Sequence, residues 1–496
     1  MPDYVPPRVD DGALSQTIGK YASSIIVKQV LGVLNAYLKP LMLAPTIYGL
    51  WNLLNTLISL NWLIHLGART AMRYRIPANE AKSNESANRD IMGTVFYGSL
   101  FLYGSVALGL CVASMIVETD TTQRVAMVVV AVVILVDWMS GYQVEVFKGR
   151  SRFGPIITAN YISALTAGLL NLVLIILFGF YGLLAALIIS EALTMVYLQS
   201  QAGSLTLGRF NVGVYLDLIR EGFPIISFSL VESLVGVMDR LIIAAWLGLE
   251  ELGYYGIAIT AFGFLMRIPD ASREVVEPLL MRDLQTRPAS DCLRDYVQRP
   301  LLFTAYALPL LLGPVILLLP AVVEILLPQY VRGVIPAQIL TAGCLFMAMI
   351  LVLRGLIIAR QYQVKASGIM LVAALFSGLL NVLFLTIGWG LVGVAIASTG
   401  SFLILFMGLL RFLVNRELDM PPLSLLTLFT PMLVATIILT GVLILAEWIE
   451  VAQWVSGSIG CVIFFSIMIP LYNLKGMHSG YWQSLNPRTI LGRYQR

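Results

Sequence analysis

Two stretches of the sequence nearly copy each other and decide the fold: Ala167-Gly168-Leu169-Leu170-Asn171 and Ser377-Gly378-Leu379-Leu380-Asn381. Two further pairs repeat at nearly the same interval, namely Tyr48-Gly49 with Tyr255-Gly256, and Gly179-x-x-Gly182 with Gly390-x-x-Gly393. A shared period of roughly 210 residues indicates that two halves of one architecture were joined. In a chain this apolar, duplicated halves are typical of secondary transporters.

The composition places the chain in a membrane. Hydrophobic residues make up 58% of the sequence and charged residues 12%, which is about half the charge of a soluble protein. Apolar runs long enough for a spanning helix recur throughout, and the alternating pattern of an outer-membrane barrel does not occur. We therefore expect an all-α polytopic membrane protein. Because no cleavable signal precedes the first apolar run, we expect that run to be retained as a span.

The sequence predicts fourteen transmembrane helices. Their expected ranges are 17–40, 44–66, 92–116, 122–145, 155–178, 180–200, 221–247, 251–277, 298–320, 334–359, 365–387, 389–412, 424–446 and 451–473. Lysine and arginine are concentrated in alternate connections, and the opposite connections carry few of them. The positive-inside rule therefore predicts that both termini and the basic connections are cytoplasmic.

The repeat and the span count together predict three regions. Residues 1–200 and 201–415 would form two six-helix lobes, and residues 416–496 would add two helices and a cytoplasmic tail. Since the period covers six spans, orientation is kept and the repeats would be parallel, about an axis along the membrane normal. The basic stretch 68–89 is too polar to span. We interpret it as a topology-setting loop at the inner surface, in preference to a lipid-headgroup contact.

Several kinds of chemistry lack their usual sequence signals. A phosphate-binding Gly-x-x-x-x-Gly-Lys-Ser/Thr motif does not occur. His65 and His478 have no partners at metal-ligand spacing, and the four cysteines show no paired spacing. We therefore predict no catalytic residue, no metal site, no bound cofactor and no nucleic-acid partner. Transport would be driven by an ion gradient, of protons or sodium, or by the gradient of the substrate.

Charged residues inside the predicted spans are the candidates for a functional site, because a charge in the bilayer is costly unless it faces a cavity or a partner. For Lys28, Asp239 and Arg240 a cavity-facing role is favoured over a structural one. For Arg267, beside Asp270, an ion pair next to a proline is an equally good interpretation. Arg354 is placed so that its side chain can also extend to the inner interface. Glu232 lies seven residues before Asp239, hence on the same helix face.

Several segments resemble one known family. The segment 43–51, Leu-Ala-Pro-Thr-Ile-Tyr-Gly-Leu-Trp, runs on to Leu66-Gly67-Ala68-Arg69. It resembles the first two helices of the polysaccharide transporter family, the oligosaccharidyl-lipid flippases of the O-antigen type. Residues 239–243 with 253–258 resemble the family's passage from the seventh to the eighth helix, and the Gly-x-x-Gly segments resemble its sixth and twelfth helix entries. The similarity covers about residues 15–415. The same superfamily holds the multidrug and toxin extruders (MATE) and the lipid II flippase, so the resemblance implies two MATE-like lobes.

The resemblance implies the export of undecaprenyl-pyrophosphate-linked oligosaccharide units across the bacterial inner (cytoplasmic) membrane for polysaccharide or lipopolysaccharide synthesis. The pyrophosphate and the glycan would need a polar cavity, while the polyprenyl tail could stay in lipid. Substrate binding is assigned to Lys28, Arg240, Arg267 and Arg354, and coupling to a proton or Na⁺ is assigned to Asp239 and Glu232. The expected partners are the lipid-linked oligosaccharide, membrane lipids, a polysaccharide polymerase and glycosyltransferases.

Two alternatives remain open at this point. An ion-coupled multidrug or toxin extruder would need a cavity dominated by carboxylates and aromatic rings. A membrane-embedded glycan-modifying enzyme would need a carboxylate or histidine cluster near the outer face, and the short outer connections offer none. The final two helices favour a lipid-exporting member, because the multidrug branch usually has twelve spans.

Overall fold

The computed structural model describes residues 32, 35–117, 119–203, 207–417, 422–448 and 453–479, and these residues contain helices and no strand. The prediction of an all-α membrane protein is confirmed. Within this described part, nine helices are long and apolar enough to cross a membrane. The first expected span, 17–40, lies mostly outside the described residues, so the count of fourteen and the parallel repeat stay predictions.

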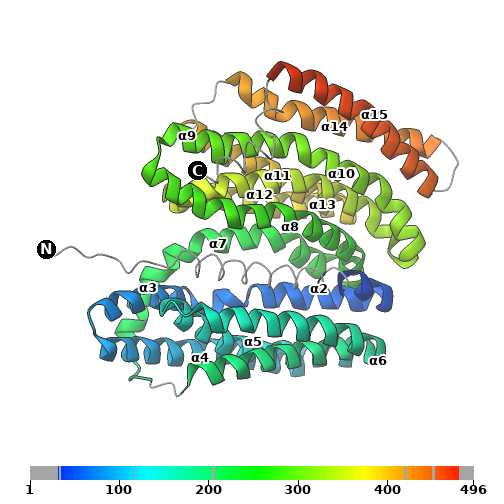
Figure 1. The fold of residues 1–496 in the computed structure, drawn as a ribbon. Coiled ribbons are helices and arrows are strands. Elements are labelled where there is room, and N and C mark those ends of the chain that lie inside the picture. Colours follow the sequence, from blue (N-terminus) through cyan, green and yellow to red (C-terminus); the bar gives the residue numbers. More distant parts are fainter. Residues whose placement is uncertain are drawn as a thin grey trace. The chain divides into compact units, whose positions relative to one another are not determined.

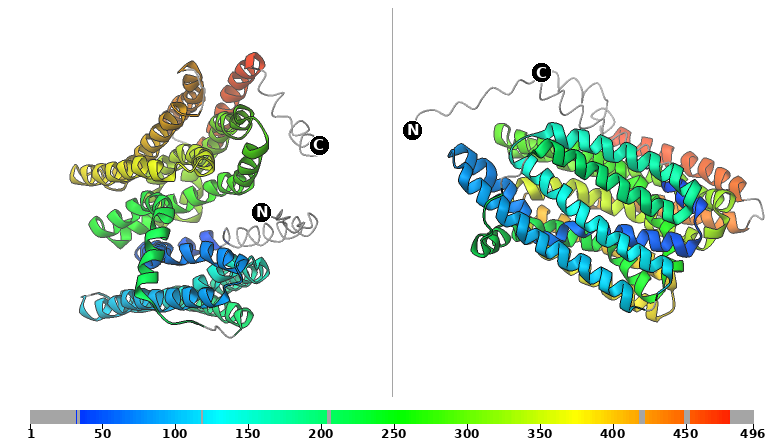
Figure 2. Two further views of the ribbon diagram at one scale, coloured as in Figure 1. Left: turned by 90° about the vertical axis from the view of Figure 1, so that its left-hand side faces the viewer. Right: turned by 90° about the horizontal axis from the view of Figure 1, so that it is seen from below.

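The chain forms two compact units, Met1–Gly253 and Tyr254–Arg496. The elements described in the first unit are α2 (Pro45–Ser59), η1 (Asn61–His65), α3 (Ala68–Ala81), α4 (Glu85–Ile116), α5 (Thr121–Gly149), α6 (Phe153–Ala202) and α7 (Val212–Trp246). In this unit α5 packs between α4 and α6, and α7 packs against α2, α3 and α4 (Figures 1 and 2). The predicted lobe boundaries, 1–200 and 201–415, stay a prediction.

Helix α3 corrects one expectation from the sequence. The stretch Ala68–Ala81 is a helix that packs against α4, α5 and α7, and not a loop at the surface. Ala68, Met72 and Ile76 lie on one face because they are four residues apart, and each is fully buried. Of the polar residues that made the stretch look like a loop, Arg69 is buried, Arg73 and Arg75 are half-buried, and Glu80 is exposed.

A tight backbone contact sets the passage from α2 into α3. The chain leaves α2 through the short 3₁₀ helix η1 and reverses its local handedness at Leu66 and Gly67, whose φ angles are 50° and 90°. Gly67 then touches the backbone of α7: a Cβ built on Gly67 would lie 2.4 Å from the carbonyl carbon of Gly222. Only glycine fits this position, because it accepts the left-handed conformation and removes the side chain at the contact.

The Gly-x-x-Gly motif has the same physical role in both halves of the sequence. Gly179 interrupts α6 with φ 57° and ψ −131°, so that α6 consists of two helical segments near the two predicted ranges. Gly390, which begins α13 (Gly390–Val414), has φ 53°. The second glycine packs against the preceding segment: a Cβ on Gly182 would lie 1.9 Å from the Leu174 carbonyl oxygen, and one on Gly393 would lie 2.7 Å from the Phe384 Cβ.

Replacing Gly182 by alanine is therefore expected to destabilise the protein, by about 1–3 kcal/mol, since an added methyl group overpacks the contact. Gly109 of α4 is the matched control, because a Cβ there meets nothing within 4 Å. Gly109→Ala should be neutral, or stabilising by about 0.5–1 kcal/mol. The temperature at which half of the purified protein loses its monodisperse elution peak measures both effects. Equal temperatures for the two variants would contradict the contact.

The second unit contains α8 (Leu249–Thr286, entering from the first unit), α9 (Ala289–Leu293), the π-helical turn η2 (Arg294–Gln298), α10 (Arg299–Leu326), η3 (Pro328–Gly333), α11 (Val334–Ala359), α12 (Gln363–Thr386), α13, α14 (Pro422–Trp448) and α15 (Gln453–Ser479). Helix α11 lies at its centre, packed against α10, α12 and α13. More residues are buried along α11 and α13 than along α12, whose outer face is apolar and exposed, as expected for contact with lipid.

The last two helices dock on α10. Phe464 and Met468 of α15 are fully buried in a core that Leu317 of α10 and residues of α14 complete. At Gly313 of α10, a Cβ would lie 2.5 Å from the ring of Phe464. The aromatic ring thus occupies the space of a missing side chain, and α15 packs close to the backbone of α10.

Candidate functional site: an apolar cavity beside a charged helix face

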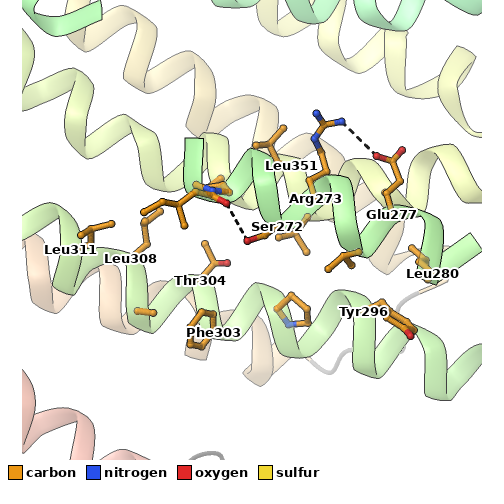
Figure 3. A pocket seen from close by; sticks show the side chains of 18 residues that line it. Ser272, Arg273, Glu277, Leu280, Tyr296, Phe303, Thr304, Leu308, Leu311 and Leu351 are labelled. Carbon is orange, nitrogen blue, oxygen red and sulfur yellow. Dashed lines mark hydrogen bonds and ion pairs between the residues drawn. The ribbon is translucent and has the colours of Figure 1, made fainter. Parts of the chain in front are cut away.

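A cavity of about 310 Å³ lies between α8, α10 and α11 of the second unit. Most of its lining is apolar, with Phe303, Leu308 and Leu311 contributed by α10. In Figure 3, Leu308 and Leu311 lie at one end of the cavity, and Leu280 and Tyr296 lie at the other. The volume is at the lower limit of small-molecule pockets, which range from about 300 to 1,000 Å³.

Helix α8 borders this cavity with a row of charged side chains. Arg273 forms ion pairs with Asp270 at 3.6 Å and with Glu277 at 3.5 Å. The spacings of three and four residues place the three side chains along one face of the helix. Arg273 and Glu277 also line the cavity, where Figure 3 shows them paired. A helix face of this kind is tolerated in an apolar protein because its opposite charges pair with one another.

Two of the predicted substrate-binding residues belong to the same charged region. The carboxylate of Asp270 lies close enough to Arg354 of α11 and to Arg267 of α8 to interact electrostatically with both, as it does with Arg273. Arg354 directly precedes the cavity-lining Gly355. The Arg267 guanidinium lies 5.7 Å from the centroid of the Phe264 ring. The fold therefore brings together Arg267 and Arg354, which are 87 positions apart in the sequence.

The turn that leads from α8 to α10 fixes the polar end of the cavity. The Tyr296 hydroxyl donates a hydrogen bond to Asp283 at 2.7 Å. Arg287 donates to Asp295 at 2.9 Å and to Asp283 at 3.1 Å, and Arg299 donates to Asp295 at 2.7 Å. These hydrogen bonds raise the pKa of Arg287, and the one with Asp295 has the largest effect. The linked carboxylates and arginines hold Tyr296 in place at the cavity wall.

The remaining predicted site residues belong to the first unit. Asp239 and Arg240 follow each other in α7, and the Asp239 carboxylate accepts a hydrogen bond from the backbone N–H of Arg240 at 2.8 Å. Asp239 is buried, whereas Arg240 and Glu232 are half-buried. Lys28 lies outside the described residues. The assignments of Lys28, Arg240, Arg267 and Arg354 to substrate binding, and of Asp239 and Glu232 to ion coupling, stay predictions.

The sequence prediction left out the residues that connect the two arginines. From the sequence, Asp270 is expected only as the partner of Arg267 in an ion pair beside a proline, and Arg273 and Glu277 as solvated or paired residues of the inner interface. The structure shows Arg273 and Glu277 paired, and it also places both on the wall of the cavity. The available signal was the spacing of Arg267, Asp270, Arg273 and Glu277, which marks one face of a helix.

A second polar cluster, within the first unit, surrounds Arg69 of α3. Arg69 is 4% exposed. Its guanidinium donates a hydrogen bond to the Trp138 carbonyl oxygen at 2.8 Å and lies over the ring of Tyr103, 4.6 Å from the ring centroid. Asn61 donates to Asp137 at 2.5 Å, and the Tyr103 hydroxyl donates to the Asn61 carbonyl oxygen at 3.1 Å. These contacts tie η1, α3, α4 and α5 together.

Replacing Arg69 by lysine is expected to lower the stability by about 1–3 kcal/mol. Lysine keeps the charge but loses the planar group that both donates to the carbonyl and stacks on the ring. Thermal unfolding of the purified protein, followed by tryptophan fluorescence, measures the loss. The matched control is Arg220→Lys in α7, because the Arg220 side chain is 81% exposed and should tolerate the change. An unchanged midpoint for Arg69→Lys would show that only the charge is required.

The fold has counterparts among solved structures. The lipid II flippase MurJ, in an inward closed conformation, superposes with a TM-score of 0.64 at 14% identity, over 91% of this chain and 98% of that chain. An inward-facing MATE-family multidrug resistance transporter of the MOP superfamily gives 0.56 at 12% identity, over 78% and 94%. A eukaryotic MATE transporter, AtDTX14, gives 0.51 at 16% identity, over 84% and 100%. The protein therefore has the fold of this superfamily of membrane flippases and transporters.

A family model also matches the amino-acid sequence. The model of the family described as "Polysaccharide biosynthesis protein" matches residues 42–336, which is more than half of the chain. The chain belongs to this family, and the membership expected from the sequence is confirmed. The comparison with curated protein sequences gives no match.

Proposed function

We propose that this protein is a flippase that exports undecaprenyl-pyrophosphate-linked oligosaccharide units across the bacterial inner membrane, with both termini in the cytoplasm. The observation that carries the proposal is the group of Arg267, Arg273 and Arg354 around Asp270, at the edge of an apolar cavity. The polysaccharide-biosynthesis family and the flippase and transporter fold support it. An amphiphile with an anionic head and a hydrocarbon tail matches both parts of this site.

The arginines would bind the pyrophosphate. A guanidinium group offers several N–H donors in a fixed plane and binds phosphate oxygens in pairs. In the absence of substrate, Asp270 and Glu277 neutralise Arg273. A bound pyrophosphate would replace these carboxylates as the partner of the arginines. Asp270 and Glu277 thus offset most of the charge of the three arginines without the ligand, and the site still has affinity for a dianion. Lys28 and Arg240 are proposed to add positive charge along the path.

Transport would proceed by alternating access of two lobes, residues 1–200 and 201–415, with 416–496 as an added pair of helices. Asp239 and Glu232, seven residues apart on α7, are proposed to hold the coupling proton or Na⁺. A polysaccharide polymerase would act on the exported units, and glycosyltransferases would supply them on the cytoplasmic side. The protein itself would catalyse no covalent step.

Deletion of the gene tests the proposal. We expect lipid-linked oligosaccharides to accumulate in the inner leaflet and the surface glycan to disappear, with both reversed by a plasmid copy. Normal surface glycan together with raised sensitivity to cationic drugs would overturn the proposal in favour of an ion-coupled multidrug extruder. An altered glycan structure at an unchanged amount would overturn it in favour of a glycan-modifying enzyme.

A further inference from the structure

We propose that the cavity between α8, α10 and α11 holds the first isoprene units of the substrate's polyprenyl tail while its head group is bound. This inference rests on the proposed function and extends it, because it gives the tail a protein site where the sequence left it in lipid. It also places the tail at α8, α10 and α11 and not at the added pair α14 and α15. The depth of the cavity, the polarity of its lining and its exposed wall support this inference.

The depth of the cavity matches one leaflet. Along α10 the cavity extends from Pro300 to Leu311, in the first half of the helix. At 1.5 Å per residue this is about 17 Å, close to half of a hydrocarbon core of about 30 Å. The start of α10 lies on the predicted cytoplasmic side, where the lipid-linked unit would be assembled. The cavity therefore covers the depth that the tail of an inner-leaflet lipid occupies.

The lining of the cavity changes along that depth from polar at the cytoplasmic end to apolar at the deeper end, which suits an amphiphile. The cytoplasmic end carries Glu277 and Tyr296, with Arg273 nearby, and the deeper end carries Leu308 and Leu311 (Figure 3). An anionic head at Arg273, which lies between these two ends along α8, would thus have the leucines on its deeper side, where its tail would lie. Since apolar cavities do not hold ordered water well, a hydrocarbon chain is the favoured occupant of the deeper part.

Part of the cavity wall is exposed. Ile268, Phe303 and Leu311 line the cavity, and their exposed fractions are 59%, 50% and 40%. An apolar chain can therefore reach the cavity through this part of its wall. The core faces of α14 and α15, in contrast, are already used against α10, where Phe464 and Met468 are fully buried. A tail seated there would have to displace this packing.

Filling the cavity gives the first test. A Cβ on Gly355 of α11 would meet only the Leu280 Cδ2, at 3.8 Å, so a leucine at this position can extend into the cavity. We expect Gly355→Leu to lower export at least tenfold at equal protein level, measured as surface glycan in cells that lack the chromosomal gene. Gly368→Leu in α12 is the matched control, because a Cβ there meets nothing within 4 Å. Full export by Gly355→Leu would overturn the proposal.

Photo-crosslinking gives a second test that needs no transport. The protein with benzoylphenylalanine in place of Phe303 is reconstituted in vesicles of phosphatidylethanolamine and phosphatidylglycerol that contain undecaprenyl pyrophosphate. Leu375 of α12, whose side chain is 67% exposed, is the control position. We expect isoprenoid adducts at position 303 to exceed those at 375 at least fivefold, and Gly355→Leu to abolish the excess. Equal isoprenoid adducts at both positions, or phospholipid adducts alone, would overturn the proposal.

The two tests separate this proposal from the proposed function. If the deletion strain loses surface glycan but Gly355→Leu exports normally, the flippase stands and the tail site is wrong. If the deletion strain keeps its glycan while the isoprenoid adducts are enriched at position 303, the cavity binds an isoprenoid and the export function is wrong.

Discussion

Exchanging Gly67 for valine is expected to leave little folded protein. The φ angle of 90° at Gly67 is strained for a β-branched residue, at a cost of about 1–3 kcal/mol. The new side chain would also meet the backbone of Gly222, with its Cβ 2.4 Å from the carbonyl carbon. Overpacking of this kind costs about 1–3 kcal/mol more. The sum is a large part of a typical stability of about 5–15 kcal/mol.

The measurement for Gly67→Val is the monodisperse fraction of a fluorescent fusion after extraction in mild detergent. Gly109→Val is the control, since it adds the same side chain to α4 where a Cβ meets nothing within 4 Å. Gly222→Ala tests the contact from its other side, because a Cβ there would lie 2.0 Å from the Gly67 carbonyl oxygen. Wild-type elution of both Gly67→Val and Gly222→Ala would show that α3 and α7 do not meet at these glycines.

Reversing the charge of Arg354 is expected to reduce export by roughly ten- to a hundredfold while the protein remains folded. A hydrogen bond to a charged group contributes about 1.5–3 kcal/mol, and each 1.4 kcal/mol changes an affinity about tenfold. Arg354→Glu removes one such donor and adds a carboxylate near Asp270, so the site would repel a pyrophosphate. Because Arg354 is half-buried and not in the packed core, the effect on folding should be smaller than that on export.

Surface glycan in complemented deletion cells, normalised to the protein in the membrane, measures the effect of Arg354→Glu. Arg220→Glu is the control with the same charge change, on a side chain that is 81% exposed. Arg354→Lys should recover part of the export, since it keeps the charge and loses the planar donor geometry. Undiminished export by Arg354→Glu would remove Arg354 from the binding site and leave the flippase function untouched.

The positions of the helices could be predicted closely from the sequence because they depend on local apolar runs. The expected span 334–359 coincides with α11, Val334–Ala359. The start of α4 was missed, since the helix begins at Glu85 with polar residues that a hydropathy argument assigns to a loop. Helix α3 was missed for the same reason, although the spacing of its buried Ala68, Met72 and Ile76 was available.

The candidate site could be predicted only in part. Arg267 and Arg354 could be proposed because a charge in an apolar run is costly, and that cost follows from one segment alone; their role stays a prediction. Their common neighbour Asp270 and the cavity wall required knowledge of how α8 and α11 pack. The contacts of Arg69 with Trp138 and Tyr103 also require knowledge of helix packing, since these three residues come from three different helices.

The docking of α15 on α10 has a consequence for shortening the chain. The ring of Phe464 occupies the place of a side chain at position 313, so any larger residue there would force this ring to move. A chain shortened before Pro422 would uncover Gly313 and Leu317, because the residues that pack on them would be lost with the last two helices.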